Sequence, residues 1–411
     1  MASTERAITQ AVVLAGGRGT RLGDLTREVP KPLLPVGGRP FLDYVIAVLA
    51  RHGVEDIILS TGYLSPAFDA FLEGRSWKGP YGNAIRVRTL VEPTPAGTAG
   101  ALKQHEAELS DRFLLLNGDS FLDGDLNALL ATGASLVQGE AFLTTREVPD
   151  AGRYGRIRLD DDRVTLFEEK SSAGAGLINA GISVLTRECV QRIDKIPCSI
   201  ETDIYPLLAE EGLLKAVVQD GYFIDIGLPE TYARAQDEVP KTFRKPALFL
   251  DRDGVLNVDR GYVHRTEDFE WMPGAIEAIR AARKVGLLTI VVTNQAGVAR
   301  GFYDESAVER LHRWINAELR RNDAWIDAFY YCPYHVDAVL PEYRRDHVDR
   351  KPGPGMINRA FADFDIDKER SFLVGDKDSD VEAAAAAGIS GFLTDGGSLL
   401  ELVRSQLPRT Q

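Results

Sequence analysis

The sequence predicts an α/β protein whose parallel sheets are covered by helices on both faces. Short runs rich in Val, Ile and Leu alternate along the whole chain with longer segments whose apolar residues recur every three or four positions. The short runs lie at residues 10–15, 55–60, 112–119, 245–251, 287–294 and 370–376. Because buried parallel strands read as apolar runs and need helical crossovers between them, this alternation is typical of three-layer αβα domains.

The segment at residues 40–53, PFLDYVIAVLARHG, shows the helical pattern. Its apolar side chains recur at three- and four-residue spacing, Pro40 suits a first turn, and Gly53 suits a C-terminal cap. The next apolar run begins two residues later, so helix and strand alternate as a crossover unit requires.

The chain is long enough for two domains, and one segment separates them. Its 411 residues exceed the roughly 150 of an average domain. Residues 237–246, DEVPKTFRKP, lack hydrophobic periodicity and hold two prolines and five charged residues, which is typical of a linker. We therefore predict two Rossmann-like domains, at residues 1–236 and 247–411, joined by a linker at 237–246.

Composition excludes several classes of protein. Hydrophobic residues make up 44% and charged residues 27%, as in ordinary globular proteins. The net charge of -13 opposes binding to nucleic acid or to an anionic membrane, and three cysteines are too few for a disulfide scaffold. We expect a cytoplasmic protein with no leader and no membrane span; a homo-oligomer stays open. His52, His105 and His312 have polar helical neighbours and are expected at the surface.

The first predicted strand runs into a glycine-rich loop of the kind that binds phosphate. Residues 16–21 read GGRGTR, and Lys31 lies between two prolines ten residues further on. Glycines let backbone N–H groups approach an anion closely, while Arg21 and Lys31 bring positive charge. A glycine turn with solvated basic side chains is the alternative for this loop taken alone.

The string at residues 14–40, LAGGRGTRLGDLTREVPKPLLPVGGRP, resembles the signature of the sugar-1-phosphate nucleotidylyltransferases, and further matches follow to about residue 236. In that family a sugar phosphate attacks a nucleoside triphosphate and pyrophosphate leaves, so catalysis consists of positioning and charge neutralisation. The resemblance implies that Arg21 and Lys31 are catalytic and that Asp119 and Asp225 hold Mg²⁺. A turn-forming role is the alternative for Asp225 alone. The implied nucleotide contacts are Gly16, Gly17, Arg18, Gly19, Thr20, Glu92, Gly97 and Thr98, and the implied sugar phosphate contacts are Tyr154, Gly155, Glu169, Lys170 and Asn179.

The second half of the chain opens with two aspartates at the end of its first predicted strand. Asp251 and Asp253 are two residues apart, so both carboxylates project to the same side and can face one phosphate. Polar groups also occur at residues 293–294, 350–351 and 375–377. Because ligands bind at the carboxyl ends of parallel strands, these groups predict a phosphate site. A turn with a capping aspartate is the alternative for the first motif alone.

This pattern resembles the haloacid dehalogenase superfamily of phosphatases. Over residues 246–390 it narrows to the D-glycero-D-manno-heptose 1,7-bisphosphate phosphatases, with histidinol phosphatases nearby; the strings DRDGVLNVDRGYVH, VVTNQAGVARGFY and VGDKDSD carry it. The resemblance implies that Asp251 is a nucleophile, that Asp253 is the general acid and then base, and that Asp251, Asp253 and Asp376 hold Mg²⁺. The implied substrate contacts are Asp259, Tyr262, Thr293, Asn294, Arg300, Arg350, Lys351 and Lys377.

One loop departs from this branch, whose members commonly hold a structural zinc with a Cys-x-His pair and a later Cys-x-Cys pair. Here residues 332–334 read CPY and residues 347–349 read HVD. We expect no structural zinc and a small buried side chain at Cys332. A mixed site of Cys332, His335, His347 and Asp349 is the alternative.

The two resemblances describe consecutive steps on one metabolite. Removal of the 7-phosphate from a heptose 1,7-bisphosphate leaves the heptose 1-phosphate that a nucleotidylyltransferase activates. We therefore predict a bifunctional enzyme of nucleotide-activated heptose synthesis, with GTP as the preferred nucleotide on resemblance alone. Two alternatives stay open: another sugar-1-phosphate transferase fused to a histidinol-phosphatase-like domain, or a sugar-nucleotide sensor with one inactive domain.

Overall fold

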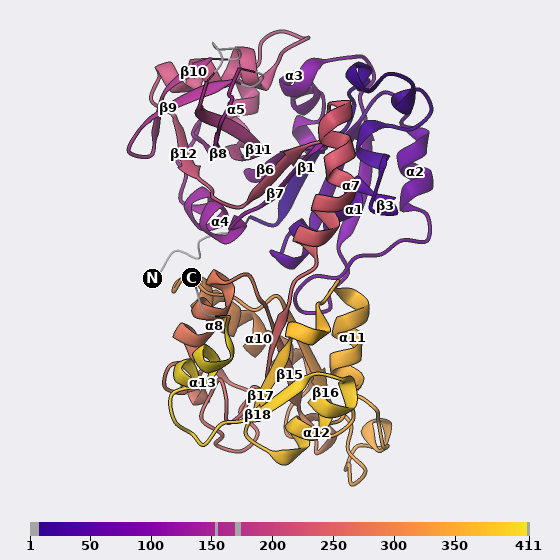
Figure 1. Ribbon diagram of the computed structural model, residues 1–411, viewed down its shortest axis with the longest axis vertical. Helices are drawn as coiled ribbons and strands as arrows, with labels where there is room; N and C mark the ends of the chain where they lie inside the picture. The colour runs from indigo at the N-terminus through magenta and orange to yellow at the C-terminus, as the bar shows by residue number, and fades with distance from the viewer. Residues whose placement is uncertain (1–7, 153–154, 169–173, 409–411) are drawn as a thin grey trace. The chain divides into compact units, whose positions relative to one another are not determined.

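The structure is a computed structural model that describes residues 8–152, 155–168 and 174–408. The chain divides into two compact units (Figure 1). One unit extends to Trp77 and resumes over Ala84–Phe243, and the other holds Lys78–Asn83 and the chain from Arg244 onward. No helix within the described ranges is long and apolar enough to cross a membrane.

The first unit is built on one large mixed sheet. Its strands in the described residues are, in spatial order, β5 (Arg86–Val91), β4 (Asp56–Thr61), β1 (Gln10–Leu14), β6 (Arg112–Asn117), β11 (Gly176–Thr186), β8 (Ala141–Val148), β12 (Leu214–Val218), β10 (Arg163–Glu168) and β9 (Arg156–Asp160). The pairings from β5 to β6 are parallel, whereas β11 runs antiparallel to both β6 and β8. Two short antiparallel pairs accompany the sheet, β7 (Ser120–Asp123) with β13 (Tyr222–Asp225) and β2 (Pro35–Val36) with β3 (Arg39–Pro40).

Helices cover both faces of this sheet. Successive strand residues point to opposite sides, so apolar side chains lie on both faces and each face needs a cover. Ala11 and Val13 of β1 belong to one buried cluster, and Val12 belongs to the other. The first cluster includes side chains from α1 (Phe41–Arg51), α2 (Pro66–Leu72), α4 (Leu126–Ala134) and α7 (Pro229–Phe243). The second includes side chains from α3 (Gly97–Gln104), α5 (Arg187–Gln191) and α6 (Tyr205–Glu210).

The structure places residues 237–243, which the sequence assigns to a linker, in the last turns of α7. Ala235, Val239 and Phe243 are buried and spaced four residues apart, so they form one apolar stripe on the helix. The stripe holds only three apolar residues in these turns, and two prolines and five charged residues lie at 237–246. The sequence therefore shows no clear helical periodicity there.

The second unit holds a five-stranded parallel sheet within the described residues. Its strands are, in spatial order, β16 (Ala328–Cys332), β15 (Leu288–Asn294), β14 (Ala247–Leu250), β17 (Phe372–Gly375) and β18 (Ser390–Leu393). One face is covered by α8 (Ala275–Lys284), α10 (Glu305–Arg320) and α13 (Leu399–Gln406), and the other by α11 (Gly355–Asp363) and α12 (Asp378–Ala387). Both units therefore confirm the predicted α/β fold of three-layer αβα domains.

Each sheet reverses its strand order beside the first strand of its unit. β1 lies between β4 and β6, and β14 lies between β15 and β17. In open α/β sheets, ligands bind in the crevice beyond the carboxyl ends of the strands at such a switch point. The loops after β1, β6, β14, β15 and β17 are therefore the expected places for both sites.

Two of the histidines expected at the surface are buried. His52 and His312 are each 1% exposed. His312 stacks on Phe329 with 4.5 Å between ring centroids, and burial holds its pKa well below the usual value. His312 lies four residues after Val308 and three before Ile315, both buried, so it is part of the apolar stripe of α10 despite its polar neighbours.

Candidate active sites

Two cavities open in the described part of the first unit, beyond the carboxyl ends of β1 and β6. The larger has a volume of about 760 Å³ and the smaller about 260 Å³. Lys31, Asp119 and Asp225 line both. All eight predicted nucleotide contacts line one or the other: Gly16, Gly17, Arg18, Glu92, Gly97 and Thr98 the larger, and Gly19 and Thr20, with Arg21, the smaller.

Two glycines are needed for the shape of the loop after β1. A Cβ at Gly16 would lie 2.4 Å from Glu92 Oε1, so a side chain there would displace the Glu92 carboxylate from the wall of the larger cavity. Gly19 has a φ of 62°, a left-handed conformation that strains other residues. The glycines thus allow close backbone approach, as the sequence predicts.

Charged side chains converge where the two cavities meet. Lys31 Nζ forms an ion pair with Asp119 Oδ2, and the backbone N–H of Gly227 donates to Asp225 Oδ1. Burial, together with the negative charge of Asp119, raises the pKa of Asp225 to about 6. Two carboxylates that repel each other in one cavity are a suitable oxygen donor set for a divalent cation, so Asp119 and Asp225 fit Mg²⁺.

Glu201 also lines the larger cavity, and the sequence analysis did not single it out. It lies in the short helical turn Ile200–Ile204 and accepts hydrogen bonds from Thr98 Oγ1 at 3.0 Å and Ser199 Oγ at 3.3 Å. Burial raises the pKa of Glu201. No local signal identifies this residue, because it is brought to the pocket by a segment about 100 residues from Thr98.

The predicted sugar phosphate contacts of the first unit are less well placed. Gly155 and Asn179 do not line either of these two cavities, and Asn179 Oδ1 accepts from the backbone N–H of Gly181 at 3.0 Å. Tyr154, Glu169 and Lys170 lie outside the described residues.

The second unit gathers buried charges at the carboxyl ends of β14 and β17. Asp251 follows β14 and is 6% exposed. Lys351 Nζ lies 2.8 Å from Asp251 Oδ2 and 2.6 Å from Asp380 Oδ1, and all three side chains are buried. Burial raises the pKa of Asp251 to about 6. Burial alone would lower the pKa of Lys351, but attraction to the two carboxylates raises it.

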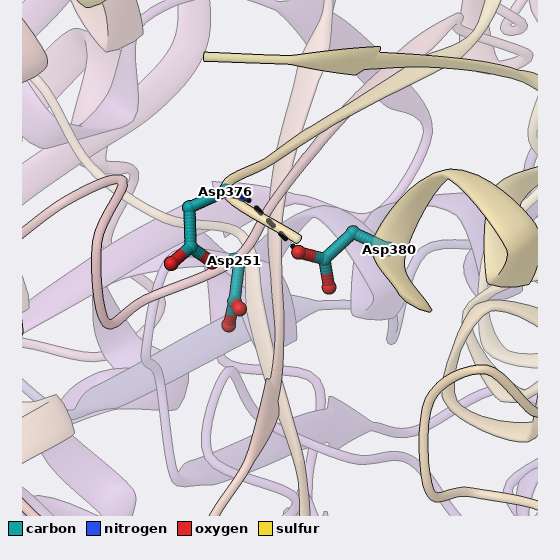
Figure 2. Close-up of side chains that lie close together, drawn as sticks. All are labelled: Asp251, Asp376 and Asp380. Carbon is teal, nitrogen blue, oxygen red and sulfur yellow. Dashed lines mark hydrogen bonds between the residues drawn. The ribbon is translucent and has the colours of Figure 1, made fainter. Parts of the chain in front are cut away.

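Asp251, Asp376 and Asp380 form a carboxylate cluster, with one oxygen of each lying within 4.8 Å of the others. Figure 2 shows the three side chains, with the backbone N–H of Asp376 donating to Asp380 Oδ2 at 3.2 Å. Asp376 Oδ1 is buried without a hydrogen-bond partner in the described structure. Three carboxylates with an unsatisfied buried oxygen fit a divalent cation such as Mg²⁺.

The third carboxylate of this cluster is Asp380 rather than Asp253, which the sequence proposes as a ligand. Asp253 Oδ1 accepts from Asn257 Nδ2 at 3.0 Å, and both oxygens accept from Arg252 Nη2, at 3.0 and 2.8 Å. Asp253 is therefore directed away from the cluster. The string VGDKDSD contains Asp380, which lies in the first turn of α12 and accepts at its Oδ2 from the backbone N–H of Asp376.

The predicted substrate contacts of the second unit differ in what their side chains touch. Lys377 Nζ lies 3.4 Å from Asp376 and 3.5 Å from Asp259. Asn294 uses both ends of its amide on the backbone of Lys351, at 3.1 Å each, so it positions the lysine. The other predicted contacts are Thr293, buried at the end of β15, Arg300, 5.9 Å from the ring centre of Tyr262, and Arg350, whose Nη1 donates to the Tyr334 carbonyl at 3.3 Å.

The loop that carries the altered ligand pairs, at residues 332–334 and 347–349, makes several contacts within the protein. The ring centroids of Tyr334 and His347 are 4.5 Å apart. The Arg345 guanidinium lies over the Tyr334 ring, 3.8 Å from its centroid. Asp349 Oδ2 accepts from Arg359 at 2.9 Å. Cys332 is buried, and burial raises the pKa of its thiol to about 11.

Comparison with known proteins gives matches to both units. Residues 10–242 match the family model described as nucleotidyl transferase, and residues 348–404 match the model described as HAD-hydrolase-like. A D-glycero-beta-D-manno-heptose-1,7-bisphosphate 7-phosphatase of Rhodopseudomonas palustris is 46% identical over 168 residues, 41% of this chain and 93% of that protein.

Two solved structures resemble the first unit. HddC from Yersinia pseudotuberculosis is 31% identical and covers 56% of this chain and 100% of its own, with a TM-score of 0.49. A putative glucose-1-phosphate thymidylyltransferase from Bacillus anthracis is 24% identical, covers 55% of this chain and 93% of its own, and has a TM-score of 0.50. The latter likeness concerns the fold alone.

Proposed function

Because this chain belongs to the nucleotidyl transferase family through residues 10–242 and to the heptose-1,7-bisphosphate 7-phosphatase family through its second unit, we propose that it is a bifunctional enzyme of activated heptose synthesis. The second unit removes the 7-phosphate of D-glycero-D-manno-heptose 1,7-bisphosphate. The first unit transfers GMP from GTP to the resulting heptose 1-phosphate, giving GDP-heptose and pyrophosphate. Both reactions use phosphorylated metabolites of the cytoplasm, where we place the protein.

The observation that supports this proposal is that each unit gathers charged side chains at its own switch point. Lys31, Asp119 and Asp225 meet in the first unit, and Asp251 and Lys351 meet in the second. A sensor with one inactive unit has no need of both sets. The product of the reaction proposed for the second unit is the substrate of the reaction proposed for the first. This relation favours consecutive steps over unrelated activities.

In the phosphatase, one carboxylate acts as nucleophile and another moves protons. An Asp251 oxygen attacks the phosphorus, the bond from phosphorus to the sugar oxygen breaks, and Asp253 protonates that oxygen. Asp253 then takes a proton from water, whose oxygen attacks the phosphorus and breaks the aspartyl phosphate bond. Lys351 neutralises phosphoryl charge, and Mg²⁺ held by Asp251, Asp376 and Asp380 would offset repulsion between carboxylate and phosphate.

In the nucleotidyltransferase, the substrates react directly. An oxygen of the sugar phosphate attacks the α-phosphorus of GTP, and the bond to pyrophosphate breaks. Arg21, Lys31 and the glycine-loop N–H groups neutralise and orient the triphosphate, while a cation held by Asp119 and Asp225 would supply further positive charge. The attacking oxygen is already ionised, so this step needs no general base.

Glu92 supports guanine as the preferred base. It lines the part of the larger cavity formed by residues 92–98. An ionised carboxylate only accepts hydrogen bonds, and guanine presents two adjacent donors, N1–H and N2–H, on its Watson–Crick edge. Uracil and thymine present one donor between two acceptors, so the second oxygen of Glu92 would face a carbonyl oxygen that also only accepts.

Phosphorus NMR of the purified chain tests the proposal. The protein is given either anomer of heptose 1,7-bisphosphate, Mg²⁺, and each nucleoside triphosphate in turn. We expect release of inorganic phosphate, followed by pyrophosphate and a GDP-sugar with GTP only. Faster hydrolysis of histidinol phosphate, or faster transfer to another sugar 1-phosphate, would favour a different sugar-1-phosphate transferase fused to a histidinol-phosphatase-like domain. No turnover at one of the two sites would favour a sugar-nucleotide sensor.

A further inference from the structure

The amide of Gln295 joins four functional groups of the phosphatase site, and nothing in the chemistry above uses it. Gln295 follows β15 and is 1% exposed. Its Nε2 donates to Asp253 Oδ2 and to Thr293 Oγ1, each at 2.9 Å. Its Oε1 accepts from the Tyr303 hydroxyl at 2.8 Å and from Arg252 Nη2 at 3.2 Å.

These contacts determine which way the amide points. Arg252 is a donor only and is fully buried, so it must face the amide oxygen. The amide nitrogen therefore faces Asp253 and Thr293, as the carboxylate requires. All four hydrogen-bonding positions of Gln295 are filled, and such a saturated buried network holds its members in one geometry.

The network holds two residues that act on the substrate: the proton donor Asp253 and the phosphate-binding residue Thr293. Asp253, which protonates the leaving oxygen, is held by donors from three residues, Arg252, Asn257 and Gln295. Thr293 Oγ1 accepts from Gln295, so its single hydroxyl hydrogen is directed elsewhere and is available to a phosphoryl oxygen. One side chain thus sets the position of the proton donor relative to the phosphate-binding hydroxyl.

We propose that Gln295 is a positioning residue for leaving-group protonation in the second unit. The proposal rests on the phosphatase function proposed above. Without the amide, Asp253 keeps its place through Arg252 and Asn257 but loses its link to Thr293. Protonation of the departing oxygen becomes poorly aligned, whereas attack by Asp251 is affected less.

The test compares esters whose leaving groups depend differently on an acid. Hydrolysis of heptose 1,7-bisphosphate releases an alkoxide that needs a proton, and hydrolysis of p-nitrophenyl phosphate releases a stable phenolate. The full chain is assayed with Mg²⁺ as wild type, Gln295→Met and Gln295→Glu. Gln295→Met keeps the volume of the side chain. Gln295→Glu keeps the acceptor contacts to Tyr303 and Arg252 and removes the two hydrogen bonds that Nε2 donates. The second variant is the test if the first does not fold.

We expect kcat for the sugar ester to fall on the order of 100-fold, as for loss of general acid catalysis, with less than about a 10-fold fall for the aryl ester. Tyr303→Phe is the matched control, because it removes a contact to Gln295 but leaves both donors in place; its ratio of the two rates should equal that of wild type. Equal losses on both esters, or no loss, would overturn the inference. Failure of the wild type to hydrolyse the heptose bisphosphate would instead overturn the proposed function, and the comparison would then use the best alkyl phosphate of a substrate panel.

Discussion

The buried charges around Lys351 predict that two substitutions in the phosphatase site differ sharply in their effect on stability. Asp251→Asn removes one carboxylate, but Lys351 keeps Asp380 at 2.6 Å, so one buried cation still faces one buried anion. We expect the free energy of unfolding to change by less than about 1 kcal/mol, because burial raises the pKa of Asp251 to about 6 and so disfavours the charge that the substitution removes. Lys351→Met leaves Asp251 and Asp380 buried without their cation, and loss of one partner of a buried pair lowers stability by about 3–5 kcal/mol.

The same two variants are expected to lose phosphatase activity and to keep nucleotidyl transfer. An asparagine cannot form an aspartyl phosphate, so phosphate release by Asp251→Asn should fall at least about a thousandfold. Pyrophosphate release from GTP and heptose 1-phosphate should stay nearly unchanged, because the residues that line its cavities belong to the first unit.

Guanidinium unfolding followed by tryptophan fluorescence measures the stability difference. Three of the four tryptophans, at positions 271, 314 and 325, belong to the second unit, so fluorescence reports mainly on it. The full chain is unfolded in EDTA, so that no bound cation compensates for the lost lysine. Lys284→Met, at an exposed position of the second unit, is the control and should change stability by less than about 0.5 kcal/mol. Substantial phosphate release by Asp251→Asn would refute the nucleophile, and equal stability of the Asp251 and Lys351 variants would refute the buried-pair reasoning.

Three further predictions concern other parts of the chain. Asp119→Ala and Lys31→Ala should each lower nucleotidyl transfer by about 100-fold in a pyrophosphate assay and leave phosphate release intact; near-normal transfer in both would reject the triphosphate site. Elemental analysis should find well under one zinc per chain, and phosphatase activity should return when Mg²⁺ is added after zinc chelation; stoichiometric zinc that disappears in Cys332→Ser would contradict this. The unfolding free energy should fall with decreasing pH below about 6.5, because the unfolded chain binds a proton at His312 that the buried ring cannot take. His312→Gln should reduce that slope by up to about 1.4 kcal/mol per pH unit, and an unchanged slope would show that this histidine is not responsible.

The sequence by itself determined the α/β class and predicted which residues line the cavities of the first unit. Strand and helix periodicity are local properties, so they can be read without knowing what packs against them. The glycine loop is a contiguous motif, and the rule that ligands gather beyond the carboxyl ends of parallel strands brings residues 16–20 and Asp119 to one place. The same rule brings Asp251 and Asp376 to one edge of the second sheet.

Side-chain partnerships were decided only by the tertiary structure. The sequence placed Asp253 among the proposed metal ligands, but its carboxylate accepts from Arg252 and Asn257, and the structure groups Asp380 with Asp251 and Asp376. The burial of His312 and the role of Gln295 were equally hidden. A motif tells which residues reach the edge of a sheet, whereas the atoms that meet there depend on rotamers and on elements distant in the chain, because hydrogen bonds are satisfied within a few tenths of an ångström.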